Sequence, residues 1–342
     1  MFPTPIDICK GLKTFYSCKG LDVRSSSETS KSVLHSLKLA YMPLVDQLIT
    51  QADGMAYYAH LLEPNLESIK SKRLKIDFDE MFRMYIIGIL ERCHIACMTS
   101  IARTSRWLSS SLNQLEEGNL LGFSASLRGL LEGAADAHDA TSCTIDHLYK
   151  GFPFIYLRAG SVSNQVKPVL LEELENRLIH YVYAGKPKKG SAPLPHHTNK
   201  SNYDYIKAVE MAGAAGAILL YSMLCELTHP AAPSIACFLE ESDKKITLNF
   251  SKDKKIIHEI LNDFESTIEN FVTQTVNSAL LSLILLKRIS PSIPAPCDSF
   301  FAGNERITAM LKNIDQFIEL ANSEGFVFTD DMWGAKLLLI AK

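Results

Sequence analysis

The sequence lacks both a long apolar run and a strong charge of either sign. Its longest apolar stretch, Met211–Cys225, has about 15 residues and includes glycine, serine and tyrosine, which is short for a bilayer-spanning helix and typical of a buried core helix. The formal net charge of −3 gives no overall attraction to nucleic acid, so any such site must be a local patch. The first residues lack the basic start and apolar run of a signal peptide. We therefore expect a cytoplasmic protein with no membrane partner.

Several motifs that carry chemistry are also missing. The eight cysteines include no CxxC pair, so we expect reduced, mostly buried thiols and no metal site. There is no G-x-x-x-x-G-K-[ST] loop, no G-x-G-x-x-G turn and no G-x-S-x-G elbow. Nucleotide hydrolysis by a P-loop, dinucleotide binding and serine-hydrolase chemistry are therefore without support, and we expect no cofactor.

Helical spacing of apolar residues dominates the chain, which predicts an all-α, multi-helix bundle. Strand signals occur at about 234–250, where SIACFLE and KITLNF flank ESDK, and they predict one small β-hairpin. We expect an N-terminal segment at 1–28, the bundle core at 29–290 and a C-terminal helical extension at 291–342 after a proline-rich linker. Helices are expected at 27–52, 79–115, 120–149, 169–184, 203–229 and 254–288.

One of these helices, LRGLLEGAADAHDA, carries a polar stripe. At about 100° per residue, Arg128, Glu132, Asp136 and Asp139 share one side, while leucine and alanine fill the other. Glycine and alanine next to the stripe favour close packing by another helix. Two interpretations stay open: a solvated face with an i,i+4 ion pair, or the charged wall of an internal cleft.

A second motif, YSMLCELTHPAAPS, ends a helix at a histidine. Tyr221, Cys225 and His229 lie toward one side of this helix, and Glu226 is near them. Pro230 disfavours helical geometry at His229, so the imidazole is expected at the helix C-terminus, where the helix dipole favours a protonated ring. The ring is either a C-terminal cap or a general acid or base.

A basic loop, AGKPKKGSAPLPHHTNKSN at 184–202, leads into the helix that ends at His229. Its length is at the upper end for a connection within a domain. Lys186, Lys188 and Lys189 are available to phosphate if the loop lies at the rim of a cleft, and are solvated otherwise.

Together with LENRLIHYVYA, which contains His180, these motifs resemble those of a group of uncharacterised bacterial helical proteins. That group shares an Arg-x-x-x-Glu helix and a later Tyr-x-x-Leu-(Ser/Cys)-x-x-x-His-Pro helix end. It in turn resembles HEPN-type bundles, many of which are ribonucleases or toxins of conflict and phage-defence systems. The resemblance covers 120–238. HEPN nucleases usually carry Arg and His on one helix with four to six residues between them. This sequence has no such pair, so a nuclease would need Arg128 and His229 to converge from two helices.

Three functions follow as hypotheses. The first is a metal-independent ribonuclease or toxin of a bacterial defence module, with Arg128, Glu132 and His229 as catalytic residues and RNA or a nucleotide-like anion as ligand. The second is a non-catalytic module that binds a protein partner from the same operon or forms a homo-oligomer. The third is a pocket for a small anionic ligand held by Arg128. The binding residues would be Asp136, His180, Lys186, Lys188, Lys189, Tyr221, Cys225 and Glu226.

Two structural expectations accompany these hypotheses. The helices that carry Arg128 and His229 should pack side by side, because both are rich in small residues and both carry a polar stripe. Glu132, if internal, should pair with Arg128 or with a group on the second helix, because an unpaired buried carboxylate is costly. If Glu132 is fully buried, Glu132→Ala should lower the free energy of unfolding by several kcal/mol.

Overall fold

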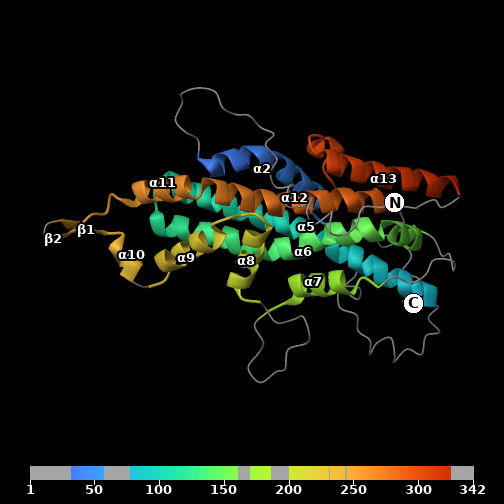
Figure 1. Cartoon of the computed structure of the whole chain (residues 1–342), viewed down its shortest axis with the longest axis horizontal. Helices are drawn as coiled ribbons and strands as arrows, with labels where there is room; N and C mark the ends of the chain where they lie inside the picture. The colour runs from blue at the N-terminus through green and yellow to red at the C-terminus, as the bar shows by residue number, and fades with distance from the viewer. Residues whose placement is uncertain are drawn as a thin grey trace, which may run out of the picture. The chain divides into compact units, whose positions relative to one another are not determined.

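The computed structural model describes residues 32–57, 78–160, 170–185, 200–230, 232–242 and 245–324. These residues form ten α-helices, one short 3-10 helix and one two-stranded antiparallel sheet (Figure 1). The prediction of an all-α bundle with one small β-hairpin is therefore confirmed.

The chain folds into two compact units, each built from three separate segments. The first unit comprises Met1–Gln47, Thr99–Asp139 and Lys200–Asn277, and the second comprises Leu48–Met98, Ala140–Asn199 and Ser278–Lys342. Four long helices contribute residues to both units: α2 (Val33–Ala52), α5 (Phe78–Glu117), α6 (Leu120–Gly160) and α12 (Glu265–Ile289). The division of the chain at 28 and 290 stays a prediction.

The first unit contains the hairpin and several short helices. These helices are α8 (Asn202–Ala212), α9 (Ala217–Thr228), α10 (Ala232–Ala236) and α11 (Asp253–Asp263). Strands β1 (Leu239–Ser242) and β2 (Lys245–Leu248) pair with Leu239 opposite Leu248, and the hairpin extends beyond α10 and α11 (Figure 1). The first strand therefore begins later than SIACFLE predicts, because the start of that stretch is helical.

Two expected helices are each broken in two, and both single-helix predictions were wrong. The helix predicted at 203–229 ends at Ala212 and resumes at Ala217. Gly213 and Gly216 lie between the two halves and have positive φ angles of 134° and 86°, which glycine adopts without a Cβ clash. The helix predicted at 254–288 is interrupted at Phe264, whose φ and ψ are −117° and 19°.

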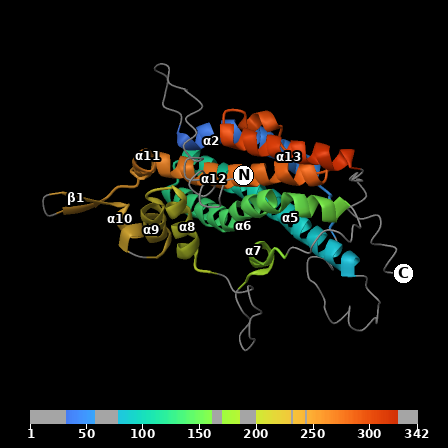
Figure 2. The ribbon, with the colours of Figure 1, turned by 45° about the vertical axis from the view of Figure 1, so that its right-hand side comes forward.

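The second unit includes α7 (Glu172–Tyr183), a short 3-10 helix (Asp298–Phe301) and α13 (Glu305–Ser323). Helix α13 runs along the later part of α12 in both views (Figure 2). Its N-terminus is capped by Asn304, whose side-chain oxygen accepts the Ile307 N–H at 3.1 Å. The helix expected after the proline-rich stretch is thereby confirmed.

Each unit has its own apolar interior, made by one face of every long helix. In the first unit, fully buried side chains include Leu34, Leu108, Phe123, Leu127, Leu220, Ile257 and Phe271. In the second unit they include Ile86, Leu90, Leu148, Phe152, Leu174, Leu178 and Leu283.

One helical segment of the described residues, Tyr85–Glu117, is long and apolar enough to span a bilayer by length and composition. In its most apolar window, 78% of the segment is buried inside the structure. Core helices of soluble proteins pass the same test, so the segment is weak evidence for a membrane span. The expected compartment stays a prediction.

Candidate functional site

The polar stripe of α6 lies at the boundary between core and solvent in the first unit. Arg128, Glu132, Asp136 and Asp139 are all half-buried. The opposite side of the helix is fully buried, as the apolar residues there predict, and includes Leu127, Leu130, Leu131 and Ala134. The division of this helix into a polar and an apolar face is therefore confirmed.

The glycines beside the stripe permit a close approach of α5. A Cβ atom on Gly129 would lie 2.9 Å from three ring atoms of Trp107, a separation that real Cβ atoms do not adopt. A Cβ on Gly133 would lie 3.5 Å from the Arg103 guanidinium, an ordinary van der Waals contact, so the close approach depends on Gly129. Close packing of another helix is confirmed at Gly129, but the helix there is α5 and not the helix that ends at His229, for which the small residues were the expected reason.

Two side-chain hydrogen bonds join the stripe of α6 to α9. The Arg128 guanidinium donates from Nη1 to Thr228 Oγ1 at 2.6 Å, and the Tyr221 hydroxyl donates to Glu132 Oε1 at 3.0 Å. Arg128 Nε also lies 3.5 Å from Glu132 Oε1. The two helices therefore pack side by side, as expected, and Glu132 has both of its anticipated partners.

Burial and neighbouring groups keep Tyr221 protonated. Its pKa is raised above the ordinary value, first by burial and then by hydrogen bonds with Cys225 and Glu132. A protonated phenol can donate to the Glu132 carboxylate at any physiological pH. Tyr221 and Cys225 therefore belong to one polar network with Glu132 and Arg128.

His229 is the C-terminal cap of α9. Its φ and ψ of −85° and 150° are extended, and its backbone N–H donates to Cys225 O at 2.9 Å, which confirms that Pro230 ends the helix at this residue. The His229 side chain is exposed. Within the described ranges, the imidazole makes no hydrogen bond.

Arg128 and His229 lie in the same neighbourhood of the first unit. The guanidinium contacts Thr228, and consecutive Cα atoms are about 3.8 Å apart. The guanidinium is therefore within about 10 Å of the His229 backbone by this bond geometry. The half-buried guanidinium of Arg128 on α6 and the exposed imidazole of His229 thus both lie at the C-terminal end of α9.

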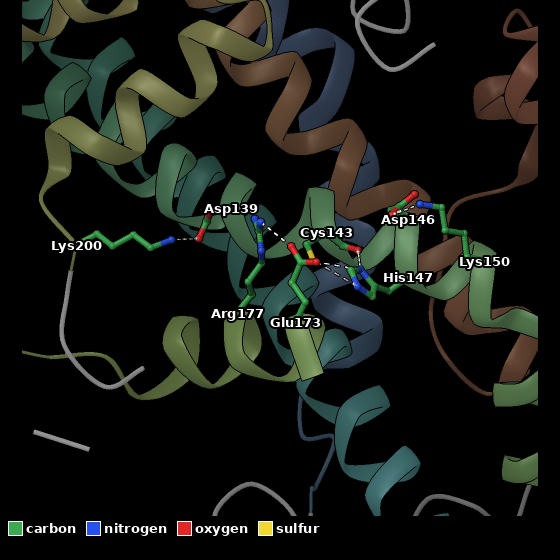
Figure 3. Close-up of polar contacts among 8 residues, drawn as sticks. All are labelled: Asp139, Cys143, Asp146, His147, Lys150, Glu173, Arg177 and Lys200. Carbon is green, nitrogen blue, oxygen red and sulfur yellow. Dashed lines mark hydrogen bonds and ion pairs between the residues drawn. The ribbon is translucent and has the colours of Figure 1, made fainter. Parts of the chain in front are cut away.

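The remaining carboxylates of the stripe are also paired. Asp136 accepts from Arg103 Nη1 at 2.7 Å. Asp139 accepts from Lys200 Nζ at 2.7 Å, as Figure 3 shows. Lys200 also lies over the ring of Tyr205 at 5.4 Å. Burial raises the pKa of Tyr205, and Asp136 and Asp139 raise it further. The contact of Asp136 with Arg103 is thus a salt bridge between α6 and α5.

The structure places two of the other predicted binding residues, Glu226 and His180. Glu226 is exposed on α9. His180 is buried on α7 of the second unit. Lys186, Lys188 and Lys189 lie outside the described residues, so their position at a cleft stays a prediction.

The sequence did not lead us to predict three residues that contact the stripe: Thr228, Arg103 and Lys200. Thr228 follows Tyr221 by two helical turns and so lies on the same side of α9, which was a usable signal. Arg103 and Lys200 come from segments whose positions relative to α6 depend on tertiary packing, and no local pattern indicates them.

A second polar cluster, in the second unit, was also missed. Cys143 and His147 lie one turn apart on α6, and Glu173 and Arg177 lie one turn apart on α7 (Figure 3). The i,i+4 spacing of Cys and His in CTIDH was the signal available in the sequence. Among the described residues, no group of three or more His, Cys, Asp or Glu side chains could hold a metal ion.

Comparison with protein-family models, with curated proteins and with solved structures finds no match to this chain. Assignment of a function therefore depends on the geometry of the two clusters.

Glu132→Ala should lower the free energy of unfolding by about 1–2 kcal/mol, because it removes the acceptor of Tyr221 and the partner of Arg128. The loss is smaller than full burial would give, since the Glu132 side chain is 27% exposed. Chemical denaturation of the two proteins measures it, with exposed Glu226→Ala on α9 as the control. Equal stability of Glu132→Ala and wild type would show that the network does not hold α6 to α9.

Proposed function

We propose that the first unit binds RNA at Arg128 and His229 and cleaves it without a metal ion, as a HEPN-like ribonuclease of a bacterial defence or toxin system. The observation that carries this proposal is the hydrogen bond from Arg128 to Thr228. It places a cation beside the helix end where His229 exposes its imidazole. RNA cleavage needs such a pair, namely a base for the 2′-hydroxyl and a cation for the charge that develops on phosphorus.

Arg128 keeps donors for a phosphate while it holds its protein partners. A guanidinium has five N–H groups in a planar fork. In the part of the chain that the structure describes, Nη1 has Thr228 and Nε has Glu132 as its partner, which leaves the other N–H groups of the fork. The side chain is 28% exposed, so a phosphate oxygen can reach the remaining N–H groups. Glu132 and Tyr221 orient the guanidinium and need no contact with RNA.

His229 is suited to proton transfer by its position. The ring is exposed at the end of α9, so a ribose can approach it without rearrangement of the core. A histidine gains or loses a proton within the physiological pH range. In this role, His229 takes the proton of the 2′-hydroxyl, and the resulting oxyanion attacks the adjacent phosphorus.

The whole chain should cleave single-stranded RNA in the presence of EDTA and leave 2′,3′-cyclic phosphate ends. This product follows because the attacking group is the 2′-hydroxyl. Gel analysis of an end-labelled RNA, with the same sequence as DNA for the control, measures the reaction. Intact RNA after prolonged incubation, or cleavage only with added Mg²⁺, would refute the proposed chemistry.

A second candidate function, non-catalytic binding of a protein partner, is favoured by the hairpin. Ile246 and Leu248 of β2 are 68% and 69% exposed, and Phe250, two residues beyond the strand, is 69% exposed. Alternate residues of a strand face the same side, so Ile246 and Leu248 form an exposed apolar face of the hairpin. RNA cleavage by the wild-type chain would distinguish the two candidates, because a binding module has no such activity.

A further inference from the structure

The cluster on α6 and α7 of the second unit joins a thiol, an imidazole and a carboxylate in a row. Cys143 Sγ lies 3.2 Å from His147 Nδ1, and His147 Nε2 lies 3.8 Å from Glu173 Oε2. Arg177 Nη2 in turn donates to Glu173 Oε1 at 3.0 Å (Figure 3). A nucleophile next to a base that is itself oriented by a third group is the arrangement that activates thiols and hydroxyls in proteins.

Helices α6 and α7 position the side chains of Cys143, His147 and Glu173. Cys143 and His147 are one turn apart, which places both side chains on one face of α6. Leu174 and Leu178 are fully buried, and this apolar packing fixes the helix that carries Glu173 and Arg177. The contacts of Nδ1 with Cys143 therefore orient the His147 ring, and Nε2 lies at ion-pair distance, 3.8 Å, from the Glu173 carboxylate.

His147 can accept the thiol proton at Nδ1. The tautomer with its proton on Nε2 leaves the Nδ1 lone pair toward the Cys143 thiol, but the Cys143 carbonyl oxygen can only accept, so it favours the state in which Nδ1 carries a proton. After transfer, the Nδ1 proton lies between the thiolate and the Cys143 carbonyl oxygen, which is 3.0 Å from Nδ1. The protonated ring therefore has an acceptor at Nδ1 and a carboxylate near Nε2, which favours the state with a thiolate on Cys143.

The surroundings select the reagent that can reach Cys143. The residue is only 8% exposed, so a bulky electrophile has no approach. The nearby charges compensate each other, because Arg177 pairs with Glu173 and Lys150 pairs with Asp146 at 2.7 Å (Figure 3). The site thus has no net charge to attract an ionic substrate, and it suits a small uncharged electrophile.

We propose that Cys143 is a reactive thiol that hydrogen peroxide or another small hydroperoxide oxidises to a sulfenic acid, with His147 as proton carrier and Glu173 as positioning residue. The thiolate sulfur attacks one peroxide oxygen, the S–O bond forms and the O–O bond breaks. Sulfur loses two electrons and the peroxide gains them. The thiol proton, held on His147, passes to the leaving oxygen, which departs as water from hydrogen peroxide or as an alcohol from an organic hydroperoxide.

The test compares oxidation rates of individual cysteines in the folded whole chain. The protein is exposed to hydrogen peroxide at neutral pH, quenched with catalase and unfolded in dimedone and an alkylating reagent, and each cysteine peptide is quantified by mass spectrometry. Cys143 should lose its free thiol on the order of tenfold faster than Cys97, because thiolate character sets the rate. Cys97 is the reference thiol, since complete burial and the neighbouring Cys93 hold its pKa well above the usual value.

Three variants assign the roles. His147→Gln should lower the rate at Cys143 to that of Cys97, and Lys150→Gln should leave it unchanged. Glu173→Gln alters a side chain that is 63% exposed, so it should preserve the fold even if His147→Gln does not. It should slow oxidation near neutral pH and approach the wild-type rate above about pH 9, where a thiol ionises without help.

Equal rates at Cys143 and Cys97 in the wild type would overturn the proposal. So would wild-type rates at neutral pH in Glu173→Gln, because the carboxylate would then have no part in activating the thiol. A rate in Glu173→Gln that is reduced equally at every pH would indicate a structural effect and would also overturn the role of Glu173.

Discussion

Lowering the pH from 7 to 4 should reduce the free energy of unfolding by about 3 kcal/mol through one buried histidine, His94. This side chain is fully buried in the second unit, and burial lowers its pKa from 6.5 to about 4. The Tyr57 hydroxyl lies 2.6 Å from His94 Nδ1. Burial also raises the pKa of Tyr57 to about 12, so the phenol stays protonated and can donate to the neutral ring.

The direction follows from proton binding in the two states. In the unfolded chain His94 takes up a proton as the pH falls through 6.5, whereas in the folded chain it stays neutral until about pH 4. Between these values the unfolded state binds more protons, so acid favours unfolding. The contribution is fully present above pH 6.5, and below about pH 4 no further stability is lost through this group.

Urea denaturation at a series of pH values measures this loss, with His94→Gln as the matched variant. Glutamine has a similar volume and can accept from Tyr57, but it does not titrate. Carboxylates elsewhere affect both proteins equally, so the difference in pH dependence isolates His94. Parallel stability curves for the two proteins between pH 7 and 4 would show that His94 is not buried in its neutral form.

The sequence predicts the helices well and their interruptions poorly. Apolar spacing locates α5, α6, α7 and α13, because one buried face imposes the helical period on each. The break at Gly213 and Gly216 was missed, since both glycines lie within an apolar stretch that reads as continuous helix. Phe264 gives no local signal, because an aromatic residue in a break and one in a helix look alike in sequence.

For the candidate site, the sequence predicts only how residues are spaced within each helix, and not which helices contact each other. The stripe with Arg128 and Glu132, and the position of His229 before a proline, depend on local spacing and chain stiffness. The salt bridge of Asp136 to Arg103 depends on how α5 packs against α6. The contact of His147 with Glu173 likewise depends on the packing of α7. Single-sequence reasoning has no access to such tertiary contacts.

Substitution of His229 by alanine should reduce the RNA cleavage rate by about 100-fold or more, the usual contribution of a general base. The residue is exposed at the end of α9, so the melting temperature and the affinity for RNA should change little. His258→Ala is the matched control, because His258 is an exposed histidine on α11 of the same unit. Cleavage by His229→Ala at the rate of the His258→Ala control would remove His229 from the mechanism.

The central claim is that Arg128 and His229 act together on one phosphate, and a double-variant cycle of RNA cleavage in EDTA tests it most directly. Arg128→Gln keeps an N–H donor for Thr228 but loses the cation, and should by itself slow cleavage on the order of 100-fold. Groups that act as a unit have non-additive effects, so the double variant should be within about tenfold of the slower single variant. Losses that multiply in the double variant, or wild-type cleavage by either single variant, would contradict a shared site.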